Sequence, residues 1–269
     1  MTSTAREAMT TSGRLVGRRV IVTGAGSGIG RAVALRLSAE GAAVGVLDIR
    51  GSAADSVAAE ISSAGRPAVS CTADVGNEAS VASATATVVG SFGGLDTVVA
   101  CAGLSHPATT HGMSLEAWET MVRVNLTGVF LTIKHTVPHL VDAGGGSIVT
   151  IGSVASLVAA GQSSAYDATK GGVLQLTRSV AVEYVDDGIR ANCICPGVVA
   201  TDLASTSREL ADHAGTSGAR RSAADRLDIP MSRRADAGEI AAAVAFLCSD
   251  DASFITGAAL PVDGGFTAI

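Results

Sequence analysis

The chain has 269 residues, of which 47% are hydrophobic, 3% aromatic and 16% charged, and its net charge is −6. This length suits one large domain, and an acidic chain without a basic tract has no electrostatic basis for binding nucleic acid. No apolar run reaches the ~18 residues of a membrane span and no apolar core of a signal peptide is visible, so we expect a cytoplasmic protein without membrane or nucleic-acid partners.

Short β-branched runs alternate with longer alanine-rich segments of helical period along the chain. The predicted strands are 18–23, 43–48, 68–71, 95–100, 147–151, 190–195 and 258–262. The predicted helices are 28–40, 53–64, 77–91, 115–140, 164–185 and 237–247. This alternation is typical of a doubly wound α/β domain, with a parallel seven-stranded sheet and helices on both faces. Because aromatic residues are so few, we expect a core of Ala, Val, Leu and Ile.

The sequence divides into a flexible N-terminal tail, 1–14, and a single domain, 15–269. Residues 202–234 interrupt the regular alternation with polar, poorly periodic sequence rich in Ser, Arg and Asp. A loop of this length after the sixth strand leaves the sheet edge where doubly wound folds bind ligands, so we interpret it as a substrate loop or lid. A flexible surface insert is the alternative.

A glycine-rich turn over residues 23–30 joins the first predicted strand to the first helix. Glycines at such a turn bring bare backbone against a pyrophosphate held at the helix N-terminus. A P-loop is excluded because no Gly-Lys-Ser/Thr sequence follows. The turn therefore predicts a Rossmann-type dinucleotide-binding domain. Its predicted cofactor contacts are Gly24, Ser27, Gly28, Ile29 and Gly30.

Asp48 closes the second predicted strand, with Ile49 beside it. A carboxylate there can accept hydrogen bonds from both ribose hydroxyls of adenosine and would repel a 2′-phosphate, which favours NAD over NADP. The nearby Arg50 argues for NADP, and an N-cap of the next helix is the alternative role for Asp48. Asp74 and Val75 follow the third strand, where they could reach the adenine, although Asp74 could instead cap a helix.

Tyr166 and Lys170 are four residues apart on a predicted helix and therefore share one of its faces. A phenol has a reference pKa near 10, so a phenolic proton carrier near pH 7 needs about 4 kcal/mol of differential stabilisation. A nearby positive charge acts in that direction, whereas burial alone opposes it. Ser153 precedes Tyr166 by thirteen residues and ends the fifth strand. The pair alone also fits an ordinary surface helix, but with the cofactor signals it predicts a proton-transfer site.

Taken together, these segments resemble the short-chain dehydrogenase/reductase family in its shorter single-domain branch, from about residue 15 to the end. The matching positions are Thr23, Gly24, Gly28, Gly30, Asn125, Ser153, Tyr166, Lys170 and the segments 196–201 and 262–265. The longer branch of the family carries an extra C-terminal substrate domain, for which this chain has no room. The ordered set of matches is far more specific than any one of them.

The resemblance implies a catalytic set of Asn125, Ser153, Tyr166 and Lys170. In this set Tyr166 transfers the substrate's hydroxyl proton, Ser153 donates a hydrogen bond to the substrate oxygen, and Lys170 holds the nicotinamide ribose. Asn125 is expected to interrupt its helix and support a water that connects Lys170 to solvent. The alternatives are a strand-end cap for Ser153 and a buried structural amide for Asn125.

The resemblance also implies further cofactor contacts, in addition to Tyr166 and Lys170. They are Cys101, Ala102, Gly103, Pro196, Gly197, Val199 and Thr201. The family commonly has Asn-Asn-Ala-Gly after the fourth strand, whereas this chain has Ala-Cys-Ala-Gly over 100–103. Cys101 therefore lacks a side-chain amide that would tie neighbouring strands together.

These signals predict an NAD-dependent oxidoreductase that transfers hydride between a secondary alcohol and the corresponding ketone. A 3-oxoacyl-thioester reductase using NADP is the alternative, and a dinucleotide-binding sensor without turnover is a remote one. By resemblance we expect a homotetramer, with helices 115–140 and 164–185 at one interface. Cys193 and Cys195 fit one face of a buried strand better than a zinc site, so no metal is expected.

The substrate itself stays open at this point. The candidate lining residues are Leu104, Ser105, His106, Ser153, Val154, Ala155, Gln162 and the loop 202–234. Small apolar residues around 154–160 favour an uncharged sterol, cyclic alcohol or diol, whereas Arg208, Arg220 and Arg221 favour a carboxylate or phosphate. His106 is interpreted as a solvated loop histidine, with a hydrogen bond to a polar substrate as the alternative.

Overall fold

The computed structural model describes residues 13–159, 163–201 and 229–268. Its strands are β1 Arg19–Thr23, β2 Ala43–Asp48, β3 Ala68–Thr72, β4 Thr97–Ala100, β5 Gly146–Ile151, β6 Ile189–Pro196 and β7 Ala259–Val262. Its α-helices are α2 Gly28–Ala39, α3 Gly51–Ser63, α4 Glu78–Phe92, α5 Leu115–Met121, α6 Gly128–Asp142, α7 Ser164–Glu183 and α9 Ala237–Cys248. Short 3-10 turns are η2 Thr110–Gly112, η4 Val154–Ser156 and η6 Asp250–Ala252, and η3 Val122–Thr127 is a π-helix.

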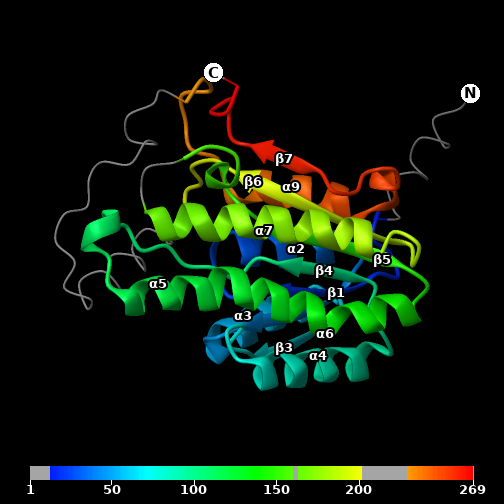
Figure 1. Cartoon of the computed structure of the whole chain (residues 1–269). Helices are drawn as coiled ribbons and strands as arrows, with labels where there is room; N and C mark the ends of the chain where they lie inside the picture. The colour runs from blue at the N-terminus through cyan, green and yellow to red at the C-terminus, as the bar shows by residue number, and fades with distance from the viewer. Residues whose placement is uncertain (1–12, 160–162, 202–228, 269) are drawn as a thin grey trace, which may run out of the picture.

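All seven strands pair in parallel in one sheet, in the order β3-β2-β1-β4-β5-β6-β7 (Figure 1). The direction of winding reverses between β1 and β4, which is the point where doubly wound sheets bind ligands. The predicted fold class is confirmed. Within the described residues, none of the helices combines the length and apolar character of a membrane-spanning segment.

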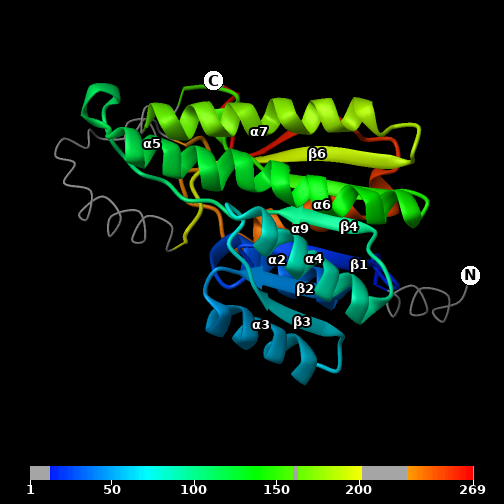
Figure 2. The same cartoon turned by 60° about the horizontal axis from the view of Figure 1, so that its bottom comes forward.

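The strands are apolar on both sides because each face of the sheet is covered. In β1, Val20 and Val22 pack with α2, α3 and α9, whereas Ile21 between them packs with α4, α6 and α7 on the other face (Figures 1 and 2). Alternate residues of a strand point to opposite faces, so a strand buried on both sides reads as one continuous hydrophobic run.

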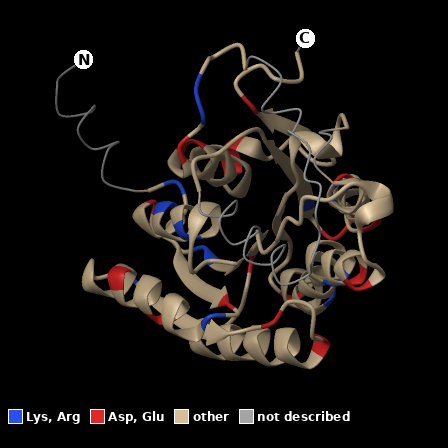
Figure 3. Cartoon of the chain, turned by 90° about the vertical axis from the view of Figure 1, so that its left-hand side faces the viewer, with Lys and Arg blue, Asp and Glu red and all other residues tan. Residues whose placement is uncertain are grey.

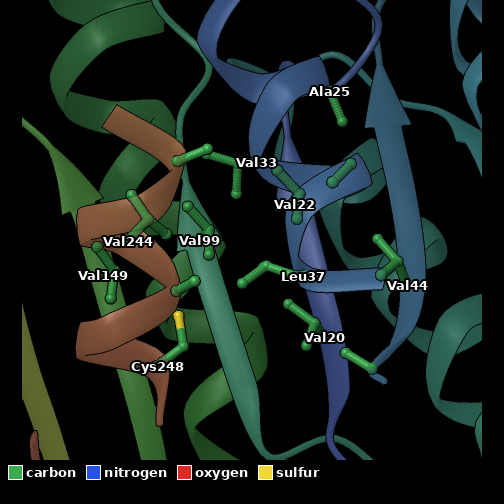
Figure 4. Packing of buried hydrophobic residues seen from close by; sticks show 14 of the residues in the cluster. Val20, Val22, Ala25, Val33, Leu37, Val44, Val99, Val149, Val244 and Cys248 are labelled. Atoms are coloured by element: carbon green, nitrogen blue, oxygen red, sulfur yellow. The ribbon is translucent and has the colours of Figure 1, made fainter. Parts of the chain in front are cut away.

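The core on the α2 and α9 side consists of small aliphatic side chains. Figure 4 shows Val20 and Val22 of β1 beside Leu37 of α2, with Val244 of α9 packed over the neighbouring strands. Every buried hydrophobic residue of this cluster is Ala, Val, Leu, Ile or Cys. For this cluster, the expected aliphatic core is confirmed.

The predicted helix 115–140 is instead three consecutive segments, α5, η3 and α6. The π-helical turn places one extra residue in the helix at Val122–Thr127, and such single turns are frequent at functional sites. Asn125 lies inside this turn and is fully buried. The prediction of one continuous α-helix over 115–140 was wrong at that turn. The interruption agrees with the separate expectation that Asn125 interrupts its helix.

Candidate active site

The carboxyl ends of the parallel strands meet at one edge of the sheet, which faces the viewer in Figure 3. The loops that follow the first six strands leave this edge, and they carry the predicted site residues together with η3 and the first turns of α7. Of the predicted lid, 202–228 lies outside the described residues, as do Gln162, Arg208, Arg220, Arg221 and residues 1–12 of the tail. The site described here is therefore built from the remaining loops.

The glycine turn after β1 leaves no room for a side chain at Gly24 or Gly30. Gly24 has φ +65°, and a Cβ on it would lie 2.7 Å from Cα of Ala102. A Cβ on Gly30 would lie 2.1 Å from the carbonyl oxygen of Gly24. Bare backbone thus meets the first turn of α2, where the helix N–H groups are available to an anion. This cradle fits the pyrophosphate of a dinucleotide.

Asp48 closes β2 directly beside the glycine turn. Its Oδ2 accepts a hydrogen bond from the Gly26 N–H at 2.9 Å, and its Oδ1 accepts one from the Arg50 N–H at 3.0 Å. The residue at the N-cap of α3 is Arg50, so the capping alternative for Asp48 was wrong. The Arg50 side chain lies over the turn and donates to the Ser27 Oγ at 2.9 Å. A carboxylate and a cation therefore flank the position expected for the adenosine ribose.

Asp74 and Val75 lie beyond the end of β3. The Asp74 carboxylate accepts from the Gly76 N–H at 2.8 Å and pairs with Arg123 at 3.2 Å. The N-cap of α4 is Asn77, so Asp74 does not cap that helix. Val75 is buried, and its side chain lies close to α6. The ion pair with Arg123 was not foreseen, because nothing in the sequence links two residues so far apart.

Thr23 ties the loop after β4 to β1 in place of the amide that Cys101 lacks. Its Oγ1 accepts hydrogen bonds from the N–H groups of Cys101 at 3.1 Å and Ala102 at 3.2 Å. Burial raises the pKa of the Cys101 thiol to about 12, so this side chain stays uncharged. From the sequence, Thr23 was predicted only as a member of the glycine motif. Its position at the end of β1, paired with Ala100 of β4, was the signal for this second role.

Asn125 joins the loop after β4 to α7. Its Oδ1 accepts from the Leu104 N–H at 2.8 Å, and its Nδ2 donates to the Leu104 carbonyl at 2.8 Å and to the Thr169 Oγ1 at 3.3 Å. A Cβ on Gly103 would lie 3.3 Å from Asn125 Oδ1 and 3.5 Å from Lys170 Nζ. These contacts bring Asn125 and Lys170 together with the loop after β4, which carries the predicted cofactor contacts Cys101 to Gly103.

Ser153 stands at the end of β5 and is mostly buried. Its Oγ accepts a hydrogen bond from the Ala155 N–H at 3.1 Å, which caps the short η4 turn. That bond occupies a lone pair of the oxygen, so the hydroxyl hydrogen can still be donated to a substrate. Capping and the predicted substrate contact are therefore compatible roles for Ser153.

Tyr166 and Lys170 face each other on the first turns of α7. The Lys170 Nζ lies 5.7 Å from the centroid of the Tyr166 ring and donates to the Ile151 carbonyl at 2.8 Å. Lys170 is only 4% exposed, so its charge is poorly screened by water. Ile151 is two residues before Ser153, and this bond therefore fixes the ammonium next to the end of β5. A phenol and an ammonium therefore lie close together beside the end of β5, and a phenol is a group that can exchange a proton with a substrate oxygen.

The segment after β6 returns to the glycine turn. Gly197 donates to the Val262 carbonyl at 3.1 Å, and a Cβ on Gly197 would lie 2.8 Å from Cα of Asp263. Thr201 Cγ2 would lie 3.5 Å from a Cβ on Gly28. The residues predicted from the Pro-Gly segment, Pro196, Gly197, Val199 and Thr201, therefore run along the same edge as the glycine turn.

Of the candidate substrate residues near β4, Ser105 and His106 are buried and Leu104 is half-buried. His106 is 4% exposed, and burial lowers the pKa of its imidazole. The interpretation of His106 as a solvated loop histidine was therefore wrong. Its segment is fixed on one side by the Asn125 bonds to Leu104 and on the other by the bridge between Ala108 and Ser163, the N-cap of α7. Val154 and Ala155 are buried as well.

Known proteins resemble the chain over nearly its whole length. A family model described as enoyl-(acyl carrier protein) reductase matches residues 24–267. The cis-4-hydroxycyclohexanecarboxylate dehydrogenase of Sinomonas cyclohexanicum is 43% identical over 253 residues, covering 94% of this chain and 97% of that protein. The 2,5-dichloro-2,5-cyclohexadiene-1,4-diol dehydrogenase of Sphingobium indicum is 39% identical over 254 residues, covering 94% and 98%.

Solved structures of dehydrogenases and reductases also resemble the chain over nearly its whole length. The crystal structure of levodione reductase has a TM-score of 0.85 at 35% identity, covering 94% of this chain and 99% of that chain. A 7α-hydroxysteroid dehydrogenase complexed with NADH and 7-oxo glycochenodeoxycholic acid has a TM-score of 0.83 at 30% identity, covering 94% and 95%. The chain belongs to the short-chain dehydrogenase/reductase family. It is an oxidoreductase of secondary alcohols and ketones that uses a nicotinamide dinucleotide.

Proposed function

We propose that this enzyme oxidises cyclic secondary alcohols with NAD, using Tyr166 as the acid–base residue. The observation that carries the proposal is the Lys170 ammonium, which is buried, fixed on the Ile151 carbonyl and 5.7 Å from the Tyr166 ring. A fixed cation next to the phenol supports this role. Nicotinamide, when bound, supplies the acceptor for the hydride.

The proton route follows from the side chains of this chain. Tyr166 as phenolate accepts the hydroxyl proton of the alcohol, and in the reverse direction it returns that proton to the ketone oxygen. Ser153 donates a hydrogen bond to the same oxygen and stabilises its charge. Asn125 holds the loop after β4 in place through Leu104, and its predicted water link to Lys170 is part of this proposal.

NAD is the proposed cofactor because Asp48 is fixed at the end of β2 by the Gly26 and Arg50 N–H groups. A carboxylate held there can accept hydrogen bonds from a ribose but repels a 2′-phosphate. The Arg50 side chain, 60% exposed over the turn, is the feature that favours NADP. We give the carboxylate the greater weight because it is buried, so its interaction with a nearby charge is less screened.

A six-membered cyclic alcohol is the proposed substrate class. Two relatives are named for cyclohexane or cyclohexadiene alcohols, and they match this chain over 94% of its length. Val154 and Ala155, next to Ser153, are apolar, which favours an uncharged ring over a charged group. The 3-oxoacyl-thioester alternative predicts instead that a short 3-oxoacyl thioester is reduced with NADPH faster than cyclohexanol is oxidised with NAD. A sensor would turn over neither compound, so the absorbance of NADPH in the first assay and of NADH in the second separates the three functions.

Substitution of Tyr166 tests the mechanism. Tyr166→Phe should lower kcat by about 10³-fold or more, because general acid–base groups contribute about 10²–10⁴-fold. NADH affinity, measured by fluorescence titration, should stay within about threefold, since the phenol acts mainly on the substrate. The only other tyrosine, Tyr184, lies at the C-cap of α7, and Tyr184→Phe is the matched control that should retain activity. Substantial turnover by Tyr166→Phe would refute the proton role.

We further propose a homotetramer in the cytoplasm. The outer surfaces of α6 and α7 carry exposed apolar side chains, among them Phe130 at 47% and Val182 at 76% exposure. Exposed large apolar side chains on neighbouring helices favour an interface. All five cysteines are free thiols, which suits a reducing compartment.

A further inference from the structure

A serine outside the predicted catalytic set connects two members of that set. The Ser156 Oγ accepts a hydrogen bond from the Ser153 N–H at 3.2 Å and donates one to the Lys170 carbonyl at 2.8 Å. In return, the Lys170 Nζ donates to the Ile151 carbonyl at 2.8 Å. Two bonds therefore reach the same residue of α7, one from β5 to the side chain of Lys170 and one from η4 to its backbone.

The bonds around η4 form a capping box whose last member reaches further than a local cap requires. Ser153 Oγ accepts from the Ala155 N–H, and Ser156 Oγ accepts from the Ser153 N–H. A capping box needs only these reciprocal bonds within its own turn. The additional bond from Ser156 to the Lys170 carbonyl crosses from the loop to α7 and sets the distance between the two segments.

The surroundings leave Ser156 little freedom to move. A Cβ on Gly152 would lie 2.7 Å from Ser156 Oγ and 2.7 Å from the Cys193 Sγ, so the backbone at Gly152 is packed tightly between them. A displacement of the hydroxyl would move the Ser153 backbone, because the N–H of Ser153 is bound to it. Small misplacements of reacting groups can cost about 100-fold in rate.

We propose that Ser156 is a positioning residue that holds the Ser153 hydroxyl in register with Lys170 and Tyr166. This inference rests on the proposed function, in which Ser153 donates to the substrate oxygen. Without the Ser156 hydroxyl the Ser153 N–H loses its partner and the η4 turn loses its bond to the Lys170 carbonyl, so the Ser153 hydroxyl no longer has a single orientation. Catalysis then suffers more than cofactor binding, because Ser153 acts on the substrate.

The test compares Ser156→Ala with the wild type and with a matched control, Ser147→Ala. Ser147 of β5 likewise donates its Oγ hydrogen to a helix carbonyl, that of Leu247 at 3.0 Å, but it lies at the end of the strand that is remote from η4. We expect Ser156→Ala to lower kcat by about tenfold or more, while its NADH dissociation constant stays within about twofold of the wild-type value. Ser147→Ala should lower the thermal midpoint while kcat stays within about twofold. Each rate is divided by the concentration of NADH-binding sites, so that unfolded protein does not lower the apparent kcat.

A double-mutant cycle separates positioning from a general loss of structure. If Ser156 acts through Ser153, then adding Ser156→Ala to a Ser153→Ala enzyme should reduce its residual kcat by less than about threefold. An undiminished tenfold loss in that background, or a wild-type kcat for Ser156→Ala alone, would overturn the inference. Full activity of Ser153→Ala would instead overturn the proposed function, so the two failures are distinguishable.

Discussion

At the scale of single residues, cofactor choice depends on two neighbours with opposite charges. Asp48 is 7% exposed, and each of its oxygens already accepts a backbone hydrogen bond. Arg50 Nε lies 3.7 Å from Asp48 Oδ1, and the guanidinium also bonds to Ser27. A phosphate on the ribose would meet the carboxylate and the guanidinium together, so the balance between them decides between NAD and NADP.

Removing the carboxylate should shift this balance. We expect Asp48→Ala to lower the ratio of kcat/KM with NAD to kcat/KM with NADP by at least about tenfold, which corresponds to about 1.4 kcal/mol. The ratio is measured on one preparation, so any loss of folded enzyme cancels. In the Asp48→Ala background, the additional substitution Arg50→Ala should lower kcat/KM with NADP, because it removes the cation that attracts the 2′-phosphate. An unchanged ratio in Asp48→Ala would show that the ribose binds elsewhere.

At the scale of secondary structure elements, the interrupted helix α5-η3-α6 organises the site. Its π-helical turn presents Asn125 to the backbone of Leu104 and to Thr169 of α7. One amide thus satisfies both polar groups of a loop residue that would otherwise be buried without partners. The loop after β4 therefore depends on a side chain from a different element for its position.

Replacing this amide should affect stability and cofactor binding together. Asn125→Ala leaves the Leu104 N–H and carbonyl unpaired, and we expect a loss of about 2–4 kcal/mol in the free energy of unfolding by urea denaturation. The NADH dissociation constant should rise at least about tenfold, because the adjoining residues Cys101 to Gly103 are the proposed ribose contacts.

A second buried asparagine supplies the control for that experiment. Asn192 of β6 donates to the Ile255 carbonyl at 2.8 Å and accepts from the Ala258 N–H at 3.0 Å, in the same pattern but away from the cofactor loops. Asn192→Ala should lose similar stability while NADH affinity stays within about threefold. If both variants bind NADH like the wild type, the β4 loop does not contact the cofactor as proposed.

At the scale of the whole molecule, the two faces of the sheet are covered differently. The helices α6 and α7 lie side by side in front of the sheet in both ribbon views (Figures 1 and 2). Phe130 and Val182 on these helices are exposed, although such large apolar side chains lose stabilising burial when they face water. Contact with another copy of the chain would bury them, as the proposed tetramer requires.

A charge on this surface should weaken the assembly. Phe130→Glu is expected to shift the molar mass measured by light scattering from four chains to two or one, because a buried carboxylate at an interface is costly. Val16, which is 65% exposed and packs near α2 on the other side of the sheet, provides the control Val16→Glu. A wild-type mass of one chain, or a Phe130→Glu tetramer as stable as the wild type, would contradict the proposed interface.

Local patterns in the sequence were enough to predict the strands, most helices and the residues expected at the site. β-branched runs and helical periods depend on neighbours a few residues apart, and so does the pairing of Tyr166 with Lys170 on one face of α7. The glycine turn is also local, because its backbone geometry tolerates only glycine at Gly24. Within two residues, the predicted ends agree with the observed elements except at the π-helical turn.

The tertiary structure alone decided which loops hold one another. Thr23 binds the loop after β4, Asp74 pairs with Arg123, and Ser156 links Ser153 to Lys170. Each of these bonds depends on the strand order and on the packing of helices over the sheet. Such contacts join segments distant along the chain, and no periodic pattern in one segment carries information about the side chain that will face it from another.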